Sequence, residues 1–458
     1  MDRDEIIAQI QKQKDGLVNS PFKDYKNRVQ ALKTLKKNIL EMENEIAEAL
    51  KKDLNKSPFE SYMSEIGMVL SELTYMIKHC KKFSKPKRVG TPLAQFPSKS
   101  YKIPSAYGCV LIISPWNYPF MLAIDPLVDA IAAGNSVVLK PSETSHNVSQ
   151  VLEKLIKKTF SPEQGFVVMG GRDKCSFLLD QEFDYIFFTG STRVGKLVIQ
   201  KAAEHFTPVT LEMGGKSPCI VDETANIELT AKRIVFGKFL NCGQTCVAPD
   251  YLYCHKSIKG KLVKEIEKQI VLQYTVDPIN NPNYPKMINE RQFNSVKNLI
   301  TKDNLVFGGK SNEQLLKIEP TIVNSTFDDE PMQNEIFGPV LPVVCFDSID
   351  EVIQRVNSLP KPLAFYVFSS SKKNQDKLLN SCDFGGGCVN DTIIHIASTN
   401  LGFGGLKESG IGAYHGKTGF DTFTHYKSIV DKKTWLDLPF RYQPASKIKD
   451  FLIRMFLK

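Results

Sequence analysis

The segment Gly108-Cys109-Val110-Leu111-Ile112-Ile113 begins a change of pattern that decides the fold. Three further short apolar runs follow it, at residues 136–139, 166–169 and 185–188. Between and after these runs, residues 147–160 and 192–206 have the apolar spacing of helices. Continuously apolar strands that alternate with helices indicate βαβ units and a parallel sheet buried on both faces. Because such sheets bind nucleotides at the carboxyl ends of their strands, we predict an α/β fold with a Rossmann-like dinucleotide-binding domain.

The rest of the chain divides into further parts. Residues 1 to about 85 have helical periodicity, and a proline-punctuated connector at residues 84–104 predicts an arm or hairpin. A second α/β pattern begins after Glu212, and residues 424–430 have the pattern of a closing strand. A chain of 458 residues is expected to form two or more domains. The predicted parts are a dinucleotide-binding domain (residues 1–90 and 109–211), a second, catalytic α/β domain (212–405), a small β oligomerisation arm (91–108 and 419–435) and an amphipathic C-terminal tail (444–458).

The composition is that of an ordinary globular protein, with 42% hydrophobic and 24% charged residues. The net charge of +9 is spread along the chain without a long basic run mixed with aromatic residues, which disfavours a nucleic-acid surface. A dinucleotide or fatty-acid carboxylates fit this positive balance equally well. The charged N-terminus lacks the apolar segment of a signal peptide, and no apolar run reaches membrane-spanning length. The 10 cysteines are scattered along the chain, so we expect them to be reduced thiols, and we therefore expect a cytoplasmic protein.

The chemistry centres on Asn241-Cys242-Gly243-Gln244-Thr245-Cys246-Val247-Ala248-Pro249, which follows a predicted helix. Backbone amides in this turn can lower the pKa of a thiol and stabilise an oxyanion, so we predict that Cys246 is the nucleophile. The alternatives are a buried structural thiol at this position and Cys242 as the nucleophile. Glu212, on a glycine-containing loop, can act as a general base rather than a surface carboxylate. Asn117, between two prolines, can donate to a developing negative charge rather than only form a turn.

Several signals indicate a dinucleotide site, although the chain lacks a strict G-x-G-x-x-G motif with an acidic partner. Residues 190–196 resemble the phosphate loop of ATPases, but Leu197 stands where that loop needs a hydroxyl for Mg²⁺. With an ATPase excluded, this segment still predicts a helix N-terminus at Ser191, which can bind a pyrophosphate. Lys140 and Glu143 follow another strand, where they could reach phosphate or ribose unless they are simply charged strand ends.

Glu335-Ile336-Phe337-Gly338-Pro339 places a carboxylate two residues from an aromatic ring, which suits gripping a second ribose beside a flat ring. The alternative is a core phenylalanine with a solvated glutamate. The seven histidines form no His-x-x-x-His or His-x-x-Glu-His pattern, so no metal site is expected. Residues 446–458 place apolar side chains on one helical face, which suits packing on this or a partner subunit, or contact with a membrane surface.

Together these motifs resemble the NAD(P)-dependent aldehyde dehydrogenase superfamily, and in particular its class 3 branch of fatty and aromatic aldehyde enzymes. The resemblance covers nearly the whole chain. Its motifs, in the family's order, are Pro115-Trp116-Asn117, Lys140-Pro141-Ser142-Glu143, Phe188-Thr189-Gly190-Ser191, Leu211-Glu212-Met213-Gly214-Gly215-Lys216, Gly243-Gln244-Thr245-Cys246 and Glu335-Ile336-Phe337-Gly338-Pro339. The segments at residues 53–60 and 412–417 are similar to those of class 3, whereas Gly402 stands where that branch usually has proline.

The resemblance implies an enzyme that oxidises medium- or long-chain aliphatic, or aromatic, aldehydes to carboxylic acids with NAD, or with NADP. It implies that Cys246 attacks the aldehyde carbon, that Asn117 and the Cys246 backbone N–H hold the oxyanion, and that Glu212 activates the water that hydrolyses a thioester. The residues that it assigns to the cofactor are Trp116, Lys140, Glu143, Gly190, Ser191, Gly214, Glu335 and Phe337. It also implies a homodimer in which the arm adds a strand to the partner's sheet.

Two other functions remain open at this point. A CoA-acylating enzyme would resolve the thioester with CoA, although the presence of Glu212 favours water. A non-catalytic dinucleotide-binding or membrane-associated scaffold would be expected to lack the nucleophile or the base, and this sequence has both.

Overall fold

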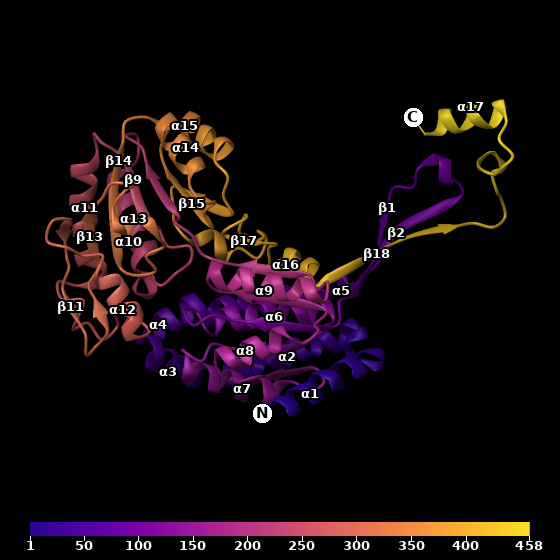
Figure 1. The fold of residues 1–458 in the computed structure, drawn as a ribbon, viewed down its shortest axis with the longest axis horizontal. Helices are drawn as coiled ribbons and strands as arrows, with labels where there is room; N and C mark the ends of the chain where they lie inside the picture. The colour runs from indigo at the N-terminus through magenta and orange to yellow at the C-terminus, as the bar shows by residue number, and fades with distance from the viewer. Residues whose placement is uncertain (458) are drawn as a thin grey trace.

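The computed structural model describes residues 1–457, which form two α/β lobes and a slender arm (Figure 1). The first lobe contains a six-stranded sheet in the order β17-β7-β6-β3-β4-β5. Its strands are β3 (Cys109–Ile113), β4 (Ser136–Lys140), β5 (Gly165–Val167), β6 (Tyr185–Thr189), β7 (Val209–Glu212) and β17 (Gly410–Ile411). All neighbouring pairs are parallel except β17 with β7. This sheet confirms the α/β fold class that the apolar runs predict.

Helices cover both faces of this sheet, which explains why its strands are apolar throughout. Val110 and Ile112 belong to one core with α2, α5, α6 and α7, whereas Leu111 and Ile113 belong to a second core with α1, α8 and α9. The helices are α1 (Arg3–Gly16), α2 (Tyr25–Glu41), α3 (Glu43–Leu54), α4 (Pro58–Ser61), α5 (Gly67–Phe83), α6 (Met121–Ala133), α7 (His146–Thr159), α8 (Arg172–Leu179) and α9 (Thr192–Glu204).

The second lobe contains a seven-stranded sheet in the order β10-β13-β14-β9-β8-β15-β16, parallel except for β10. The strands are β8 (Pro218–Val221), β9 (Tyr251–His255), β10 (Leu305–Phe307), β13 (Thr321–Asn324), β14 (Val340–Phe346), β15 (Ala364–Phe368) and β16 (Gly386–Val389). The helices are α10 (Ile227–Phe239), α11 (Lys259–Tyr274), α12 (Glu290–Lys297), α13 (Glu330–Gln333), α14 (Ile349–Ser358) and α15 (Lys372–Ser381). The late helix α16 (Gly416–Thr422) packs instead on α5 and α6 of the first lobe. Asn226 caps α10, because its side chain accepts from the Leu229 N–H at 3.1 Å.

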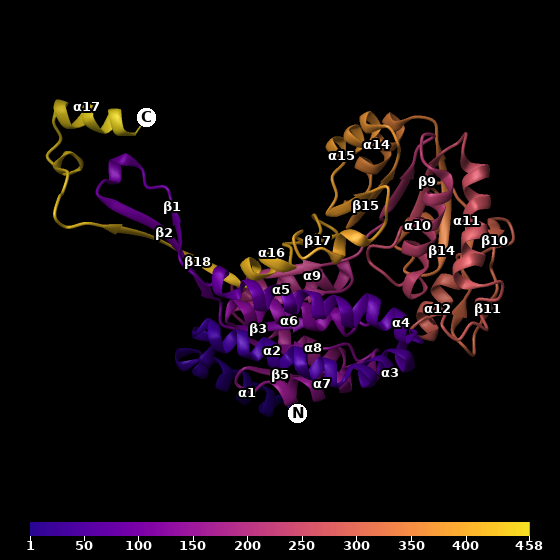
Figure 2. The same cartoon turned by 180° about the vertical axis from the view of Figure 1, so that it is seen from behind.

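The arm is a three-stranded antiparallel sheet of β1 (Lys87–Val89), β2 (Ser98–Ala106) and β18 (Thr424–Lys432). It leaves the first lobe near α16, and α17 (Lys447–Phe456) lies beyond it, apart from both lobes in either view (Figures 1 and 2). Ile448, Phe451 and Met455 of α17 are at least half exposed. Within residues 1–457, no helix combines the length and the apolar character needed to cross a membrane.

Candidate active site

The loop that presents Cys246 is held in an unusual backbone conformation. Asn241, Cys242 and Gly243 have φ values of 53°, 55° and 72°, a region that costs free energy for residues with a side chain. The Asn241 N–H donates to Glu60 Oε1 at 2.8 Å, which anchors the loop to the first lobe. A Cβ on Gly243 would lie 2.3 Å from the carbonyl oxygen of Gly338, so glycine allows the two loops to touch.

A buried ion pair supports the segment that carries Asn117. Lys56 Nζ lies 2.5 Å from Glu65 Oε1, and both side chains are 0% exposed. The same amine donates to the Asn117 backbone oxygen at 3.1 Å. Glu65 Oε2 accepts from the backbone N–H groups of Phe120 and Met121 at 2.9 and 3.2 Å. The ion pair therefore fixes both ends of the turn between β3 and α6.

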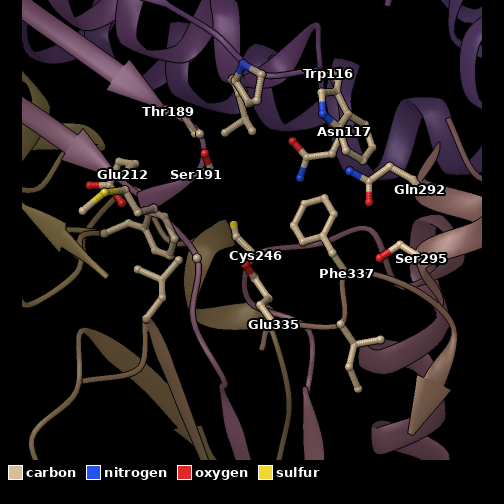
Figure 3. A pocket seen from close by; sticks show the side chains of 18 of the residues that line it. Trp116, Asn117, Thr189, Ser191, Glu212, Cys246, Gln292, Ser295, Glu335 and Phe337 are labelled. Atoms are coloured by element: carbon tan, nitrogen blue, oxygen red, sulfur yellow. The ribbon is translucent and has the colours of Figure 1, made fainter. Parts of the chain in front are cut away.

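Asn117, Glu212 and Cys246 line one cavity of about 280 Å³ where the two lobes meet (Figure 3). Asn117 follows β3, Glu212 ends β7, and Cys246 comes from the loop between α10 and β9. Asn117 Nδ2 donates to the Gln244 carbonyl oxygen at 3.0 Å, which leaves its second N–H for another acceptor. Glu212 is 2% exposed, and neither carboxylate oxygen has a hydrogen-bond partner among residues 1–457.

Burial controls the protonation of this site. It raises the pKa of Glu212 well above its ordinary value. It also raises the pKa of the Cys246 thiol to about 12, and the negative charges of Glu335 and Glu212 act in the same direction. The backbone N–H groups of Cys246 and Val247 act to lower the pKa of this thiol, as expected, but burial outweighs them and the net shift is upward. The thiol is protonated at neutral pH, and a base must remove its proton.

Nine of the eleven predicted site residues line this cavity: Trp116, Asn117, Gly190, Ser191, Glu212, Gly214, Cys246, Glu335 and Phe337. Lys140 and Glu143 do not line it but lie at and just after the end of β4. The Lys140 amine donates to the Pro141 carbonyl oxygen at 2.7 Å. The Glu143 carboxylate lies so close to Gly171 that a Cβ there would be 1.8 Å from its Oε2.

The polar groups of the cavity fit a dinucleotide. Ser191 caps α9, yet its hydroxyl makes no capping hydrogen bond, so a helix N-terminus is open to an anion. Glu335 packs against Gly214, where a Cβ would lie 2.2 Å from the carboxylate. Burial raises the pKa of Glu335 to about 8. Glu335 Oε1 and Thr189 Oγ1 are buried without a hydrogen-bond partner in the described part of the chain. Because buried polar groups are normally hydrogen-bonded, these two atoms fit a polar ligand.

A second cavity of about 200 Å³ begins on the other side of Cys246. Its walls are almost wholly apolar and come from the start of α5, from α6 and α10, and from residues 393–397. Leu122 and Cys246 line both cavities. This cavity could not be predicted from the sequence, since its apolar residues have the ordinary pattern of a core and come from separate segments.

Other residues of the site also escape sequence reasoning. Gln292 and Ser295 of α12 and the ring of Phe403 line the first cavity but belong to none of the motifs quoted above, whereas Tyr414, which also lines it, lies in the class 3-like segment at residues 412–417. Cys242 is fully buried, and its Sγ lies 3.4 Å from the Tyr284 hydroxyl.

Comparisons with known proteins agree with this geometry. The profile of the aldehyde dehydrogenase family matches residues 1–429. The chain is 46% identical over 439 residues to 4,4'-diaponeurosporen-aldehyde dehydrogenase of Staphylococcus aureus, covering 95% of each. It is 38% identical over 461 residues to aldehyde dehydrogenase family 3 member A2 of Pongo abelii, covering 98% of this chain and 94% of the relative. The substrate-bound structure of Staphylococcus aureus AldH superposes with a TM-score of 0.97 at 44% identity, covering 99% of both chains.

Proposed function

The chain belongs to the aldehyde dehydrogenase family, and from this premise we propose how its residues oxidise an aldehyde. It is an NAD(P)-dependent oxidoreductase that acts on the aldehyde group. One observation carries the proposal: Cys246 lies between a polar cavity that fits a dinucleotide and an apolar cavity that fits a hydrocarbon chain. An aldehyde whose chain occupies the apolar cavity presents its carbonyl carbon to the sulfur beside the cofactor site.

In the first step the Cys246 sulfur attacks the aldehyde carbon to form a thiohemiacetal. Because burial keeps the thiol protonated, its proton passes to a base, and we assign this role to the ionised form of Glu212, whose charge acts on the thiol. The Asn117 amide and the Cys246 backbone N–H donate to the oxyanion that develops. A nicotinamide bound beside Cys246 would supply the hydride acceptor for this carbon, which would leave a thioester on Cys246.

Glu212 then activates the water that hydrolyses the thioester. Both of its oxygens are buried and unpartnered among residues 1–457, so a water molecule in the cavity can be its hydrogen-bond donor. Its raised pKa brings it closer to the range in which a carboxylate removes a proton from water efficiently. This role favours release of a free acid over transfer of the acyl group to CoA.

Trp116, Gly190, Ser191 and Gly214 would hold the cofactor, and Glu335 and Phe337 would hold its nicotinamide ribose and ring. The rings of Trp116 and Phe337 meet edge to face at a centroid distance of 5.4 Å.

Lys140 and Glu143 hold the adenosine ribose, where the Glu143 carboxylate repels a 2′-phosphate and favours NAD. A relative from Rattus norvegicus is named as NADP-preferring, so both cofactors must be tested.

The apolar cavity supports medium- or long-chain aliphatic and aromatic aldehydes as substrates. The Staphylococcus aureus relative is named for 4,4'-diaponeurosporen aldehyde. A series of aldehydes of increasing length, measured with NAD and with NADP, should show kcat/KM rising with chain length. A preference for short polar aldehydes would contradict the assignment of this cavity.

Two variants test the mechanism. Cys246→Ala should lose aldehyde-dependent reduction of the cofactor, whereas the matched change Cys382→Ala, at a thiol that packs beneath α15 in the second lobe, should retain it. Glu212→Gln should accumulate an acyl-enzyme that mass spectrometry detects as a mass added to the Cys246 peptide. Normal turnover by Glu212→Gln without that intermediate would refute its role as the base.

We also propose a cytoplasmic homodimer. The apolar side chains of Leu197, Ile199 and Val430 are 39–51% exposed, on α9 and on the arm strand β18, and a second copy would cover them. The exposed apolar face of α17 would then pack on the partner or touch a membrane surface. Light scattering of the full chain and of a chain lacking residues 444–458 tests both parts. A full-length monomer would refute the dimer, and unchanged substrate preference and vesicle binding after truncation would dismiss a role for α17.

A further inference from the structure

Two cysteines outside the active site face each other across neighbouring strands of the second lobe. Cys254 of β9 and Cys345 of β14 are direct partners in the parallel register of these strands (Figure 1). Neighbouring strands lie about 4.8 Å apart. Disulfides join Cα atoms that are roughly 4.4–6.8 Å apart. Both side chains pack on the same core, which α10 and α11 cover, so they point to the same face of the sheet. The backbone therefore places the two sulfurs where they can be joined.

The two thiols differ in a way that suits stepwise oxidation. Cys254 is 0% exposed, whereas Cys345 is partly exposed. The neighbouring Cys254 thiol lowers the pKa of Cys345, and the positive charge of Lys259 acts in the same direction. Oxidation-sensitive cysteines are accessible thiolates that stand beside a second, resolving thiol. Cys345 has the properties of the first, and Cys254 has the properties of the second.

A third cysteine on this face provides an internal control. Cys219 of β8 pairs with Leu252, two residues before Cys254, so it is offset along the sheet. β8 and β9 lie about 4.8 Å apart, and Cys219 is offset from Cys254 by two residues along the strand direction. Together these separations place the Cα of Cys219 about 8 Å from that of Cys254. This separation exceeds the range that a disulfide spans. Cys219 is also fully buried and is not reached first by an oxidant.

We propose that Cys254 and Cys345 form a reversible oxidation site at which an organic hydroperoxide joins the two thiols as a disulfide. The Cys345 thiolate attacks the terminal oxygen of the hydroperoxide, the O–O bond breaks, and the alkoxide leaves as an alcohol after taking up a proton. The Cys345 sulfenic acid that results is attacked by the Cys254 sulfur, which loses its proton as water departs. The hydroperoxide is reduced to an alcohol and water while two thiols are oxidised to one disulfide.

The position of this pair connects it to the active site. β9 begins five residues after Cys246, and β14 begins three residues after Phe337. A disulfide would fix together the two strands that lead away from the nucleophile loop and from the Glu335–Phe337 loop. Because Cys345 is partly exposed, a thiol reductant can reach the bond and reopen it.

The experiment uses the full chain in a Cys246→Ala background, so that the catalytic thiol does not consume the oxidant. The protein is treated with tert-butyl hydroperoxide, blocked with N-ethylmaleimide, digested without reductant and analysed by mass spectrometry. We expect one linked pair of peptides that contain Cys254 and Cys345, with a mass lower by two hydrogens, which disappears after dithiothreitol. Added Cys219→Ser should keep this link, whereas Cys254→Ser should stop at a Cys345 sulfenic acid that dimedone traps.

Two results would overturn the proposal. One is the absence of the linked peptides at peroxide doses that oxidise Cys345 to sulfinic acid, and the other is a link from Cys345 to any other cysteine. Failure of dimedone to label Cys345 in folded Cys254→Ser protein would equally refute the order of the two steps. The first test needs no change at either cysteine, so it holds even if the serine variants fold poorly.

Discussion

Replacing Lys56 with methionine tests how far catalysis depends on the buried ion pair. The change keeps the length of the side chain and removes its charge, which leaves the Glu65 carboxylate buried with only the backbone N–H groups of Phe120 and Met121 as donors. Removing one partner of a buried ion pair costs about 3–5 kcal/mol. Burial already raises the pKa of Glu65 against the opposing effect of Lys56, so protonation can relieve part of this cost. We therefore expect Lys56→Met to lose about 3 kcal/mol of unfolding free energy, near the lower end of that range.

Activity should fall as well, because Lys56 Nζ holds the Asn117 backbone oxygen. That oxygen also accepts from Asn241 Nδ2 at 2.8 Å, so the loss displaces both the oxyanion donor and the nucleophile loop. A displacement of about 1 Å in a reacting group costs on the order of 10²-fold in rate. We expect kcat to fall while the KM for the cofactor changes little.

Urea unfolding and steady-state kinetics of matched variants provide the assay. Lys154→Met breaks an exposed ion pair with Glu45 at 2.7 Å and should cost about 0–1 kcal/mol with unchanged kcat. The double variant Lys56→Met/Glu65→Gln should be more stable than Lys56→Met alone, since no charge is left unpaired. The reasoning fails if Lys56→Met costs no more than Lys154→Met, or if the double variant loses the sum of the two single changes.

Three further changes have definite expected outcomes. Asn117→Ala should lower kcat by about 10²–10³-fold without weakening cofactor binding, and equal losses in both would contradict an oxyanion role. Gly214→Ala should raise the KM for the cofactor because its Cβ meets the Glu335 carboxylate, whereas Gly260→Ala, with open space around it, should not. Asp129→Asn should become more stable than the parent as pH rises. Burial raises the pKa of Asp129 in the fold, so the parent loses up to about 1.4 kcal/mol per pH unit above the ordinary pKa, and equal pH slopes in urea unfolding would refute this.

The α/β fold could be predicted because the strands of the first sheet are apolar on both faces. Val110 and Leu111 face different cores, and only burial between two helical layers makes both positions apolar. The edge strand β17 could not be predicted, because it has only two residues and its pairing with β7 depends on chain that lies far away in the sequence. The predicted run at residues 166–169 ends as a strand at Val167, two residues early.

The candidate site could be located where each functional residue stands in a short motif, as Cys246 and Glu335 do. The role of the Lys56–Glu65 pair could not be predicted in this way. Lys56 supports the Asn117 backbone oxygen, which lies 61 residues further along the chain and comes near only when the chain folds. The net upward shift in the pKa of the Cys246 thiol could not be foreseen for the same reason. Local amides are visible in the sequence, whereas the burial that outweighs them arises when two distant lobes meet.

The meeting of the lobes is therefore itself part of the chemistry. The sulfur comes from the second lobe, and both the amide of Asn117 and the carboxylate of Glu212 come from the first, so neither lobe contains a complete site. The hydrogen bonds that Asn241 makes to Glu60 and to the Asn117 backbone cross this junction and set the distance between the reacting groups. The burial at the junction keeps the resting thiol protonated, which protects it from reaction until a substrate carbonyl and a proton acceptor are both in place. Any change that separates the lobes would expose the thiol and lower its pKa, and at the same time remove the amide and the carboxylate that it needs.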